Sequence, residues 1–90
     1  MKQYEENAEV FKTLSDPNRL KIIDIIRSGE KCACVLLEEL HLSQSGLSYH
    51  MKILVESGLV NARQDGKWTY YSINEEGRKK AIYLLNEYLL

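Results

Sequence analysis

The sequence predicts a mainly α-helical domain that carries one β-hairpin, and three observations lead to this prediction. Apolar residues recur at helical spacing over residues 4–56. The pattern then changes to two extended runs on either side of Asp65-Gly66, a dipeptide typical of two-residue hairpin turns. Helical spacing returns over residues 75–90. With 90 residues, one proline and 44% hydrophobic residues, the chain is expected to fold as a single domain, residues 1–90.

The first two helices are separated by a strong start signal. Apolar residues at three-residue spacing predict a helix over residues 4–14. Asp16 can then accept hydrogen bonds from free backbone N–H groups, and Pro17 suits the first position of a helix. The second helix therefore begins at Pro17, and its broad apolar surface ends at Ser28-Gly29.

The next two helices are shorter and are joined by a tight turn. A third helix is expected around residues 35–40, and Ser43 is a good capping residue for a fourth. Gly58 stands where the end of the fourth helix needs a left-handed residue. Three residues at i, i+4 and i+7 place one face of this helix in the core: Leu47, Met51 and Leu54.

The hairpin is expected to have strands over residues 59–64 and 67–73. Its aromatic residues are predicted to pack on the core rather than to stack on bases: Trp68, Tyr70 and Tyr71. Asn74 caps a last helix over residues 75–90, whose apolar stripe is too wide for a chain of this size to cover. This stripe predicts a homodimer through the outer helices.

Charge and composition restrict the function before any motif is considered. The net charge is −1, so DNA binding cannot be inferred from a basic composition and must rest on a motif. No apolar run approaches the roughly 18 to 20 residues of a membrane helix, and the start of the chain is acidic, so we expect a cytoplasmic protein without a membrane partner. The sequence has no phosphate-binding glycine loop and no nucleophile–base pair, so neither an enzyme nor a required cofactor is expected.

The order helix, helix, short helix, turn, helix, hairpin is that of a winged helix-turn-helix, in which the second helix of the motif lies in the major groove of DNA. Glutamine can recognise an adenine edge, hydroxyl groups can donate to bases or phosphates, and lysine adds charge toward the backbone. Arg63 and Lys67 flank the hairpin turn and are expected to approach DNA beside the major groove. The outward residues of the fourth helix are Gln44, Ser45, Ser48, Tyr49 and Lys52.

His50 lies between the inner and outer faces of the same helix. A histidine there is predicted to be held by hydrogen bonds rather than to bind a base or a metal. A winged helix can also bind protein instead of DNA, and the modest net charge supports that alternative.

Cys32 and Cys34 are the two cysteines of the chain. A disulfide between them would close a small ring and stabilise little, so they are not a structural cross-link. Thiolates favour As(III), Sb(III) and soft divalent metals. Residues i and i+2 of a helix point about 200° apart, so both sulfurs are expected to reach one ion only where the start of the third helix is unwound. A redox-sensing pair and inert cysteines are the alternatives.

These segments together resemble the ArsR/SmtB family of metal- and metalloid-sensing repressors, over residues 10–75. The resemblance is carried by Cys32-Ala-Cys34, by the segments 42–51 and 56–60, and by Asp65-Gly-Lys-Trp-Thr-Tyr-Tyr71. It implies a homodimer built on the first and last helices, which binds a double-stranded inverted-repeat operator and leaves it when an inducer binds the Cys-x-Cys pair. Arsenite is the first expected inducer.

Two positions depart from the family pattern. Leu37 stands where some arsenic sensors of the family have a third cysteine, so we expect solvent or a small thiol as the third ligand. The last helix contains glutamates but no histidine, so the family's second metal site is not expected.

Overall fold

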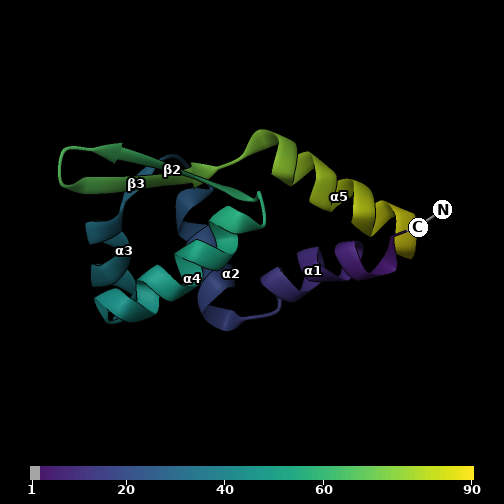
Figure 1. Cartoon of the computed structure of the whole chain (residues 1–90), viewed down its shortest axis with the longest axis horizontal. Helices are drawn as coiled ribbons and strands as arrows, with labels where there is room; N and C mark the ends of the chain where they lie inside the picture. Colours follow the sequence, from purple (N-terminus) through teal and green to yellow (C-terminus); the bar gives the residue numbers. More distant parts are fainter. Residues whose placement is uncertain (1–2) are drawn as a thin grey trace.

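A computed structural model describes residues 3–90, which form five helices and three strands (Figure 1). The predicted mainly helical fold with a β-hairpin wing is confirmed. The elements in chain order are α1 (Tyr4–Leu14), α2 (Pro17–Ile26), β1 (Lys31–Cys32), α3 (Ala33–Leu40), α4 (Gln44–Glu56), β2 (Val60–Asp65), β3 (Trp68–Ile73) and α5 (Glu75–Leu89).

The helix ends follow the capping chemistry of the sequence. Asp16 accepts hydrogen bonds from the backbone N–H groups of Asn18 and Arg19 at the start of α2. Ser43 caps α4, and Asn74 caps α5, each through a bond to the third helical residue. All three predicted capping residues are confirmed, because each satisfies an N–H group that has no partner within its own helix.

The sheet has one strand more than predicted. β1 pairs antiparallel with β3, so the strand order is β1-β3-β2, with Lys31 opposite Tyr71 and Cys32 opposite Tyr70. A strand of two residues is too short to show an alternating pattern in a sequence. It forms here because β3 has a free edge, which the segment entering α3 covers.

The turn of the hairpin lies one residue later than predicted. Asp65 pairs with Trp68, so the two residues of the turn are Gly66 and Lys67 rather than Asp65 and Gly66. Gly66 has φ +63°, and a glycine with positive φ at the first central position is what a type II′ hairpin turn requires. The shift places Lys67 at the tip of the wing.

The core lies between the sheet and the helices of the helix-turn-helix. α2 contacts α3, α4 and β3, and α4 also contacts β2. The inward face predicted for α4 is confirmed, since its three apolar residues are all buried. The buried hydrophobic cluster consists of Ile22, Ile26, Leu36, Leu47, Met51, Leu54, Leu59, Val60 and Ala81.

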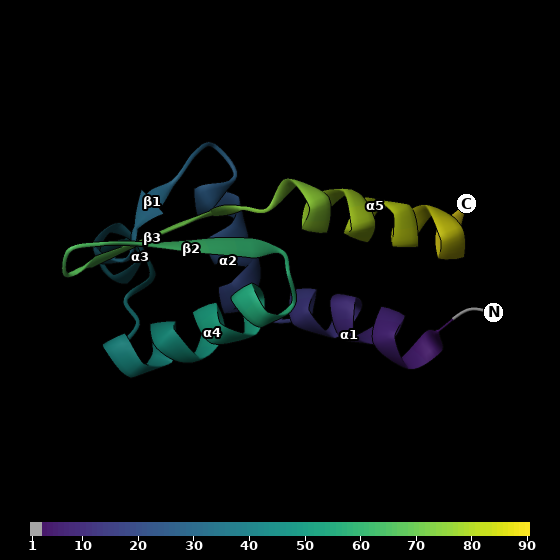
Figure 2. The same cartoon turned by 45° about the horizontal axis from the view of Figure 1, so that its top comes forward.

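α1 and α5 lie side by side and extend away from this core (Figures 1 and 2). The molecule is therefore elongated, with principal extents of 43 × 21 × 19 Å. The tip of the β2–β3 hairpin lies at the opposite end (Figure 2). Within residues 3–90, no helix is both long enough and apolar enough to cross a membrane.

Candidate DNA-binding surface and cysteine site

The outer face of α4 begins at the helix start and is polar. Its five predicted contact residues, Gln44, Ser45, Ser48, Tyr49 and Lys52, are all exposed. Tyr49 is a large aromatic side chain with 62% of its surface accessible. The helix thus presents amide, hydroxyl and ammonium groups on one side, and its other side packs against the core.

His50 is buried behind this face. Its Nδ1 lies 3.1 Å from Nη1 of Arg19 and 3.9 Å from a carboxylate oxygen of Asp16, both at the start of α2. His50 is held by a hydrogen bond as predicted, but the bond is not local as expected, because its partner Arg19 comes from another helix. Sequence spacing could not identify Arg19, because it is 31 residues away.

Arg63 on β2 is paired within the protein. Its Nε and Nη2 donate to the two carboxylate oxygens of Glu30 at 3.0 and 2.7 Å, and its guanidinium lies 4.7 Å from the ring centre of Tyr70. The hydrogen bond from Arg63 lowers the pKa of Glu30, and the same bond raises the pKa of Arg63. The positive charge of Arg63 is therefore balanced by the carboxylate of Glu30 in this conformation.

Two other side chains order the wing. Thr69 donates to Oε1 of Gln64 at 2.8 Å, and Nε2 of Gln64 donates to the carbonyl of Gly66 at 3.0 Å. Gln64 and Thr69 are opposite each other across the hairpin. The sequence does not reveal this pair with the turn predicted at Asp65-Gly66, because only a turn at Gly66-Lys67 places Gln64 opposite Thr69.

The aromatic residues of β3 divide between core and solvent. Tyr71 is partly buried against the core, and this burial raises its pKa. Trp68 is 47% exposed, and Nζ of Lys67 lies 5.6 Å from its ring centre. Core packing was therefore the wrong prediction for Trp68, because it follows the turn directly, where the hairpin extends beyond the helices.

Cys32 and Cys34 lie at the junction of β1 and α3. Cys32 is extended, with φ −69° and ψ 144°, and is the N-cap of α3, while Cys34 belongs to the first turn. The Cα atoms are 5.2 Å apart, and the structure joins the two sulfurs in a disulfide. The two cysteines are thus not both in an intact helix, and the extended start that the sequence requires for the sulfurs to meet is already present at Cys32.

A third ligand is not supplied by nearby side chains. Residues 3–90 contain no cluster of three or more histidine, cysteine, aspartate or glutamate side chains suited to a metal ion. Leu37, at the position of the third cysteine of some sensors, lines a cavity of about 200 Å³ with Gln44, Ser48 and Tyr71. This cavity lies where α3, α4 and β3 meet.

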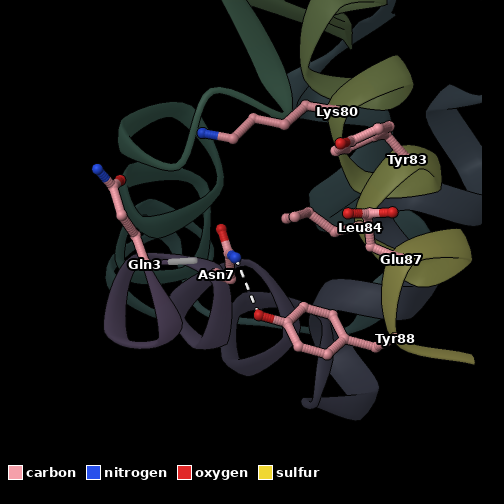
Figure 3. Close-up of a pocket in the computed structure, with 7 residues that line it drawn as sticks. All are labelled: Gln3, Asn7, Lys80, Tyr83, Leu84, Glu87 and Tyr88. Carbon is pink, nitrogen blue, oxygen red and sulfur yellow. Dashed lines mark hydrogen bonds between the residues drawn. The ribbon is translucent and has the colours of Figure 1, made fainter. Parts of the chain in front are cut away.

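A second cavity, of about 340 Å³, lies between α1 and α5 (Figure 3). Asn7 of α1 donates to the hydroxyl group of Tyr88 of α5 at 3.0 Å across it. Lys80 and Glu87 are its charged lining residues. The cavity thus places one carboxylate and one amine together between the two helices.

Comparisons with known proteins agree with this geometry. Residues 16–62 match the family described as "Bacterial regulatory protein, arsR family". The chain is 39% identical to an HTH-type transcriptional regulator of Methanocaldococcus jannaschii, over 97% of this chain and 99% of that protein. It is 48% identical to an arsenical resistance operon repressor of Staphylococcus aureus, over 92% and 80% of the two chains. A solved structure of a possible transcriptional regulator for arsenical resistance superposes with a TM-score of 0.84 at 27% identity, over 91% and 85%.

Proposed function

The chain belongs to the arsR family of bacterial regulatory proteins, and we propose that it is a repressor released from its operator by a thiophilic metalloid or metal. Membership of this family makes it a DNA-binding transcriptional regulator rather than an enzyme. Arsenite is the first choice. The observation that carries the proposal is the meeting of the Cys32 and Cys34 sulfurs at the start of α3. In their reduced form two adjacent thiols can chelate one soft ion.

The DNA side of the proposal rests on α4 and the wing. The exposed side chains at the start of α4 enter the major groove, and Lys67 at the wing tip approaches the neighbouring backbone. The chain acts as a homodimer through α1 and α5, whose exposed apolar residues need a partner. Two α4 helices related by twofold symmetry then recognise an inverted repeat.

The inducer side rests on the surroundings of the two cysteines. Arsenite, As(OH)₃, exchanges two hydroxyl groups for two sulfurs, and each hydroxyl leaves as water with a thiol proton. The third position keeps hydroxide or takes a small thiol, because Leu37 provides no sulfur. α3 packs on α4, and β1 pairs with β3 of the wing, so a change at Cys32 reaches both DNA-binding elements.

The test is release of DNA by a defined ion. The reduced chain selects a duplex from a random-sequence pool, and its affinity for that duplex is measured while arsenite, Cd(II) or Zn(II) is added. Affinity should fall about 5- to 150-fold, the usual range of coupling between two sites. A double Cys32→Ser, Cys34→Ser variant should bind the duplex equally well and ignore the ion. Continued release in this variant would remove the cysteines from the proposal.

A salt titration of the same complex separates DNA binding from a protein-interaction role. Operator affinity should fall steeply as salt rises, because displaced counterions return to the phosphates. Failure to select any duplex at low salt would contradict the proposed function itself.

A thiol redox switch at the same pair is the second candidate, because the structure joins the two sulfurs in a disulfide. In that case hydrogen peroxide takes two electrons and two protons from the thiols, forming the disulfide and two waters. Release of the duplex by peroxide, but by none of the three ions, would favour this candidate.

A further inference from the structure

Arg19 joins three helices through one guanidinium group. Its Nε donates to the carbonyl of Thr13 at 2.7 Å, near the C-terminal end of α1. Its Nη1 contacts Nδ1 of His50 on α4 at 3.1 Å, and Arg19 itself belongs to the first turn of α2. This side chain therefore connects the helix expected at the dimer interface with the helix expected in the major groove.

The contact fixes the protonation state of His50. Arginine carries only donors and stays protonated, so the nitrogen that faces it must offer a lone pair. A hydrogen bond at this contact therefore requires an unprotonated Nδ1 on His50, with the single ring proton on Nε2. The arrangement exists only while the imidazole is neutral.

We infer that Arg19 is a positioning residue for operator binding, which holds α4 in place only while His50 is neutral, so that mild acid weakens operator binding. This inference rests on the proposed function. Histidine is the side chain whose charge ordinarily changes between about pH 5 and 8. The chain has two histidines, His41 and His50, so the second provides an internal control.

The groups around His50 determine what protonation does. On the α2 side it faces Arg19 and Asp16, on its own helix the ring of Tyr49 lies 5.2 Å away, and α1 contributes backbone carbonyls to the same network. A proton on Nδ1 removes the acceptor of Arg19 and places two cations in contact. The new N–H group is then attracted to Asp16, whose carboxylate already accepts bonds from two backbone N–H groups.

The expected change in DNA affinity with falling pH is opposite to the change that net charge alone would produce. A protein that gains positive charge as the pH falls ordinarily binds phosphates more tightly. Replacing the Arg19–His50 contact by one to Asp16 instead breaks the link from α4 through Arg19 to α1 and shifts the start of the contact between α4 and α2, so binding should become weaker. A fall in affinity with acid is therefore specific to the proposed contact.

Affinity for the selected duplex is measured by fluorescence anisotropy at constant ionic strength, with a metal chelator present, from about pH 8 to about pH 5.5. The wild-type chain should lose at least about fivefold in affinity, the lower end of typical coupling. His41→Gln should follow the wild-type profile, because His41 is exposed at the end of α3. His50→Gln, which keeps an acceptor oxygen but cannot titrate, should have a flat profile. Equal or tighter wild-type binding in acid, or the same fall in His50→Gln, would overturn the inference.

Two further measurements keep the test independent of how the variants fold. Arg19→Lys keeps the charge but cannot bridge Thr13 and His50, so at about pH 8 it should bind as weakly as the wild type does in acid. Nitrogen-15 spectra of the wild-type imidazoles at the same pH need no DNA, and should show a His50 tautomer protonated on Nε2. A tautomer protonated on Nδ1 would refute the contact, whereas failure to select a duplex would refute only the proposed function.

Discussion

At the scale of single residues, Asp16 combines two roles, as the cap of α2 and as a neighbour of Arg19 and His50. Its partial burial raises its pKa, but hydrogen bonds from the N–H groups of Arg19 and Asn18 and the charge of Arg19 outweigh this effect, so the pKa is lowered overall. A carboxyl group whose folded pKa lies below the unfolded value stabilises the fold above the unfolded pKa and loses that contribution as pH falls.

We therefore expect Asp16→Asn to lower the free energy of unfolding at neutral pH. The difference from the wild type should shrink below about pH 4, where the unfolded aspartate takes up its proton. Urea unfolding at several pH values measures this difference. An unchanged difference at about pH 3 would show that the charge of Asp16 is not involved.

The exposed side chains of α4 divide into two chemical groups that should behave differently. Gln44→Ala, Ser48→Ala or Tyr49→Ala should relax sequence preference by about 1 to 3 kcal/mol at one base pair. Lys52→Ala or Lys67→Ala should instead weaken all duplexes and flatten the salt dependence. Binding to the selected duplex and to scrambled duplexes distinguishes the two results. If both groups of variants behave alike, the face of α4 assigned to the groove is wrong.

Residues whose partners are near in sequence could be predicted, and residues with distant partners could not. Asp16, Ser43 and Asn74 cap the N–H groups two or three positions ahead, which a local pattern reveals. Arg63 is expected to approach DNA, and the sequence does not indicate its partner Glu30, which binds it from 33 residues away. Nothing local marks such a pair, because it depends on β1 joining the sheet beside β3.

At the scale of elements, β1 connects the cysteine pair to the wing. Glu30 immediately precedes β1 and holds Arg63 of β2, with Nη2 of Arg63 2.7 Å from a carboxylate oxygen. We expect Glu30→Gln to free Arg63 for phosphate contact. Affinity for duplexes of any sequence should rise, and the slope of log affinity against log salt should steepen by about 0.9, the value for one added contact.

The control for this variant is Asp24→Asn, which removes the same charge from an exposed pair with Arg27 on α2. It should leave the salt slope unchanged. The double variant Glu30→Gln, Arg63→Gln should return to the wild-type slope or below it. A steeper slope in the double variant would mean that Arg63 is not the residue released.

The elements themselves were predictable where their patterns were long. The helices and the hairpin have several turns or alternations each, and the structure reproduces them. β1 and the turn at Gly66-Lys67 depend instead on pairing with β3, so their positions are set by tertiary contacts. The position of Cys32 has the same origin, because it ends the short strand β1 and is the extended N-cap of α3.

At the scale of the whole molecule, the α1–α5 end carries the exposed apolar surface. Ile82, Tyr83 and Leu89 on α5 are 47%, 60% and 79% exposed. We expect sedimentation equilibrium at micromolar concentration to give a dimer. Ile82→Glu should shift it toward the monomer, because a carboxylate in an apolar interface loses its hydration.

Leu20→Glu is a matched control, since Leu20 on α2 is 52% exposed but lies outside α1 and α5. It should leave the dimer intact. A monomeric wild-type chain would contradict the proposed dimer, and dissociation by both variants would place the interface elsewhere.

If the apolar side of α5 binds a second copy, as proposed, the free energy of unfolding depends on the concentration of the protein. α5 holds its residues Ala81 and Leu84 against the rest of the chain, while its exposed apolar residues would be covered by the second copy in the proposed dimer. Any partner that binds only the folded state stabilises it, and the gain in unfolding free energy rises with the logarithm of the free partner concentration. A cell that makes few copies of this chain would therefore hold it in a less stable form, and abundance itself would tune how long each copy lasts.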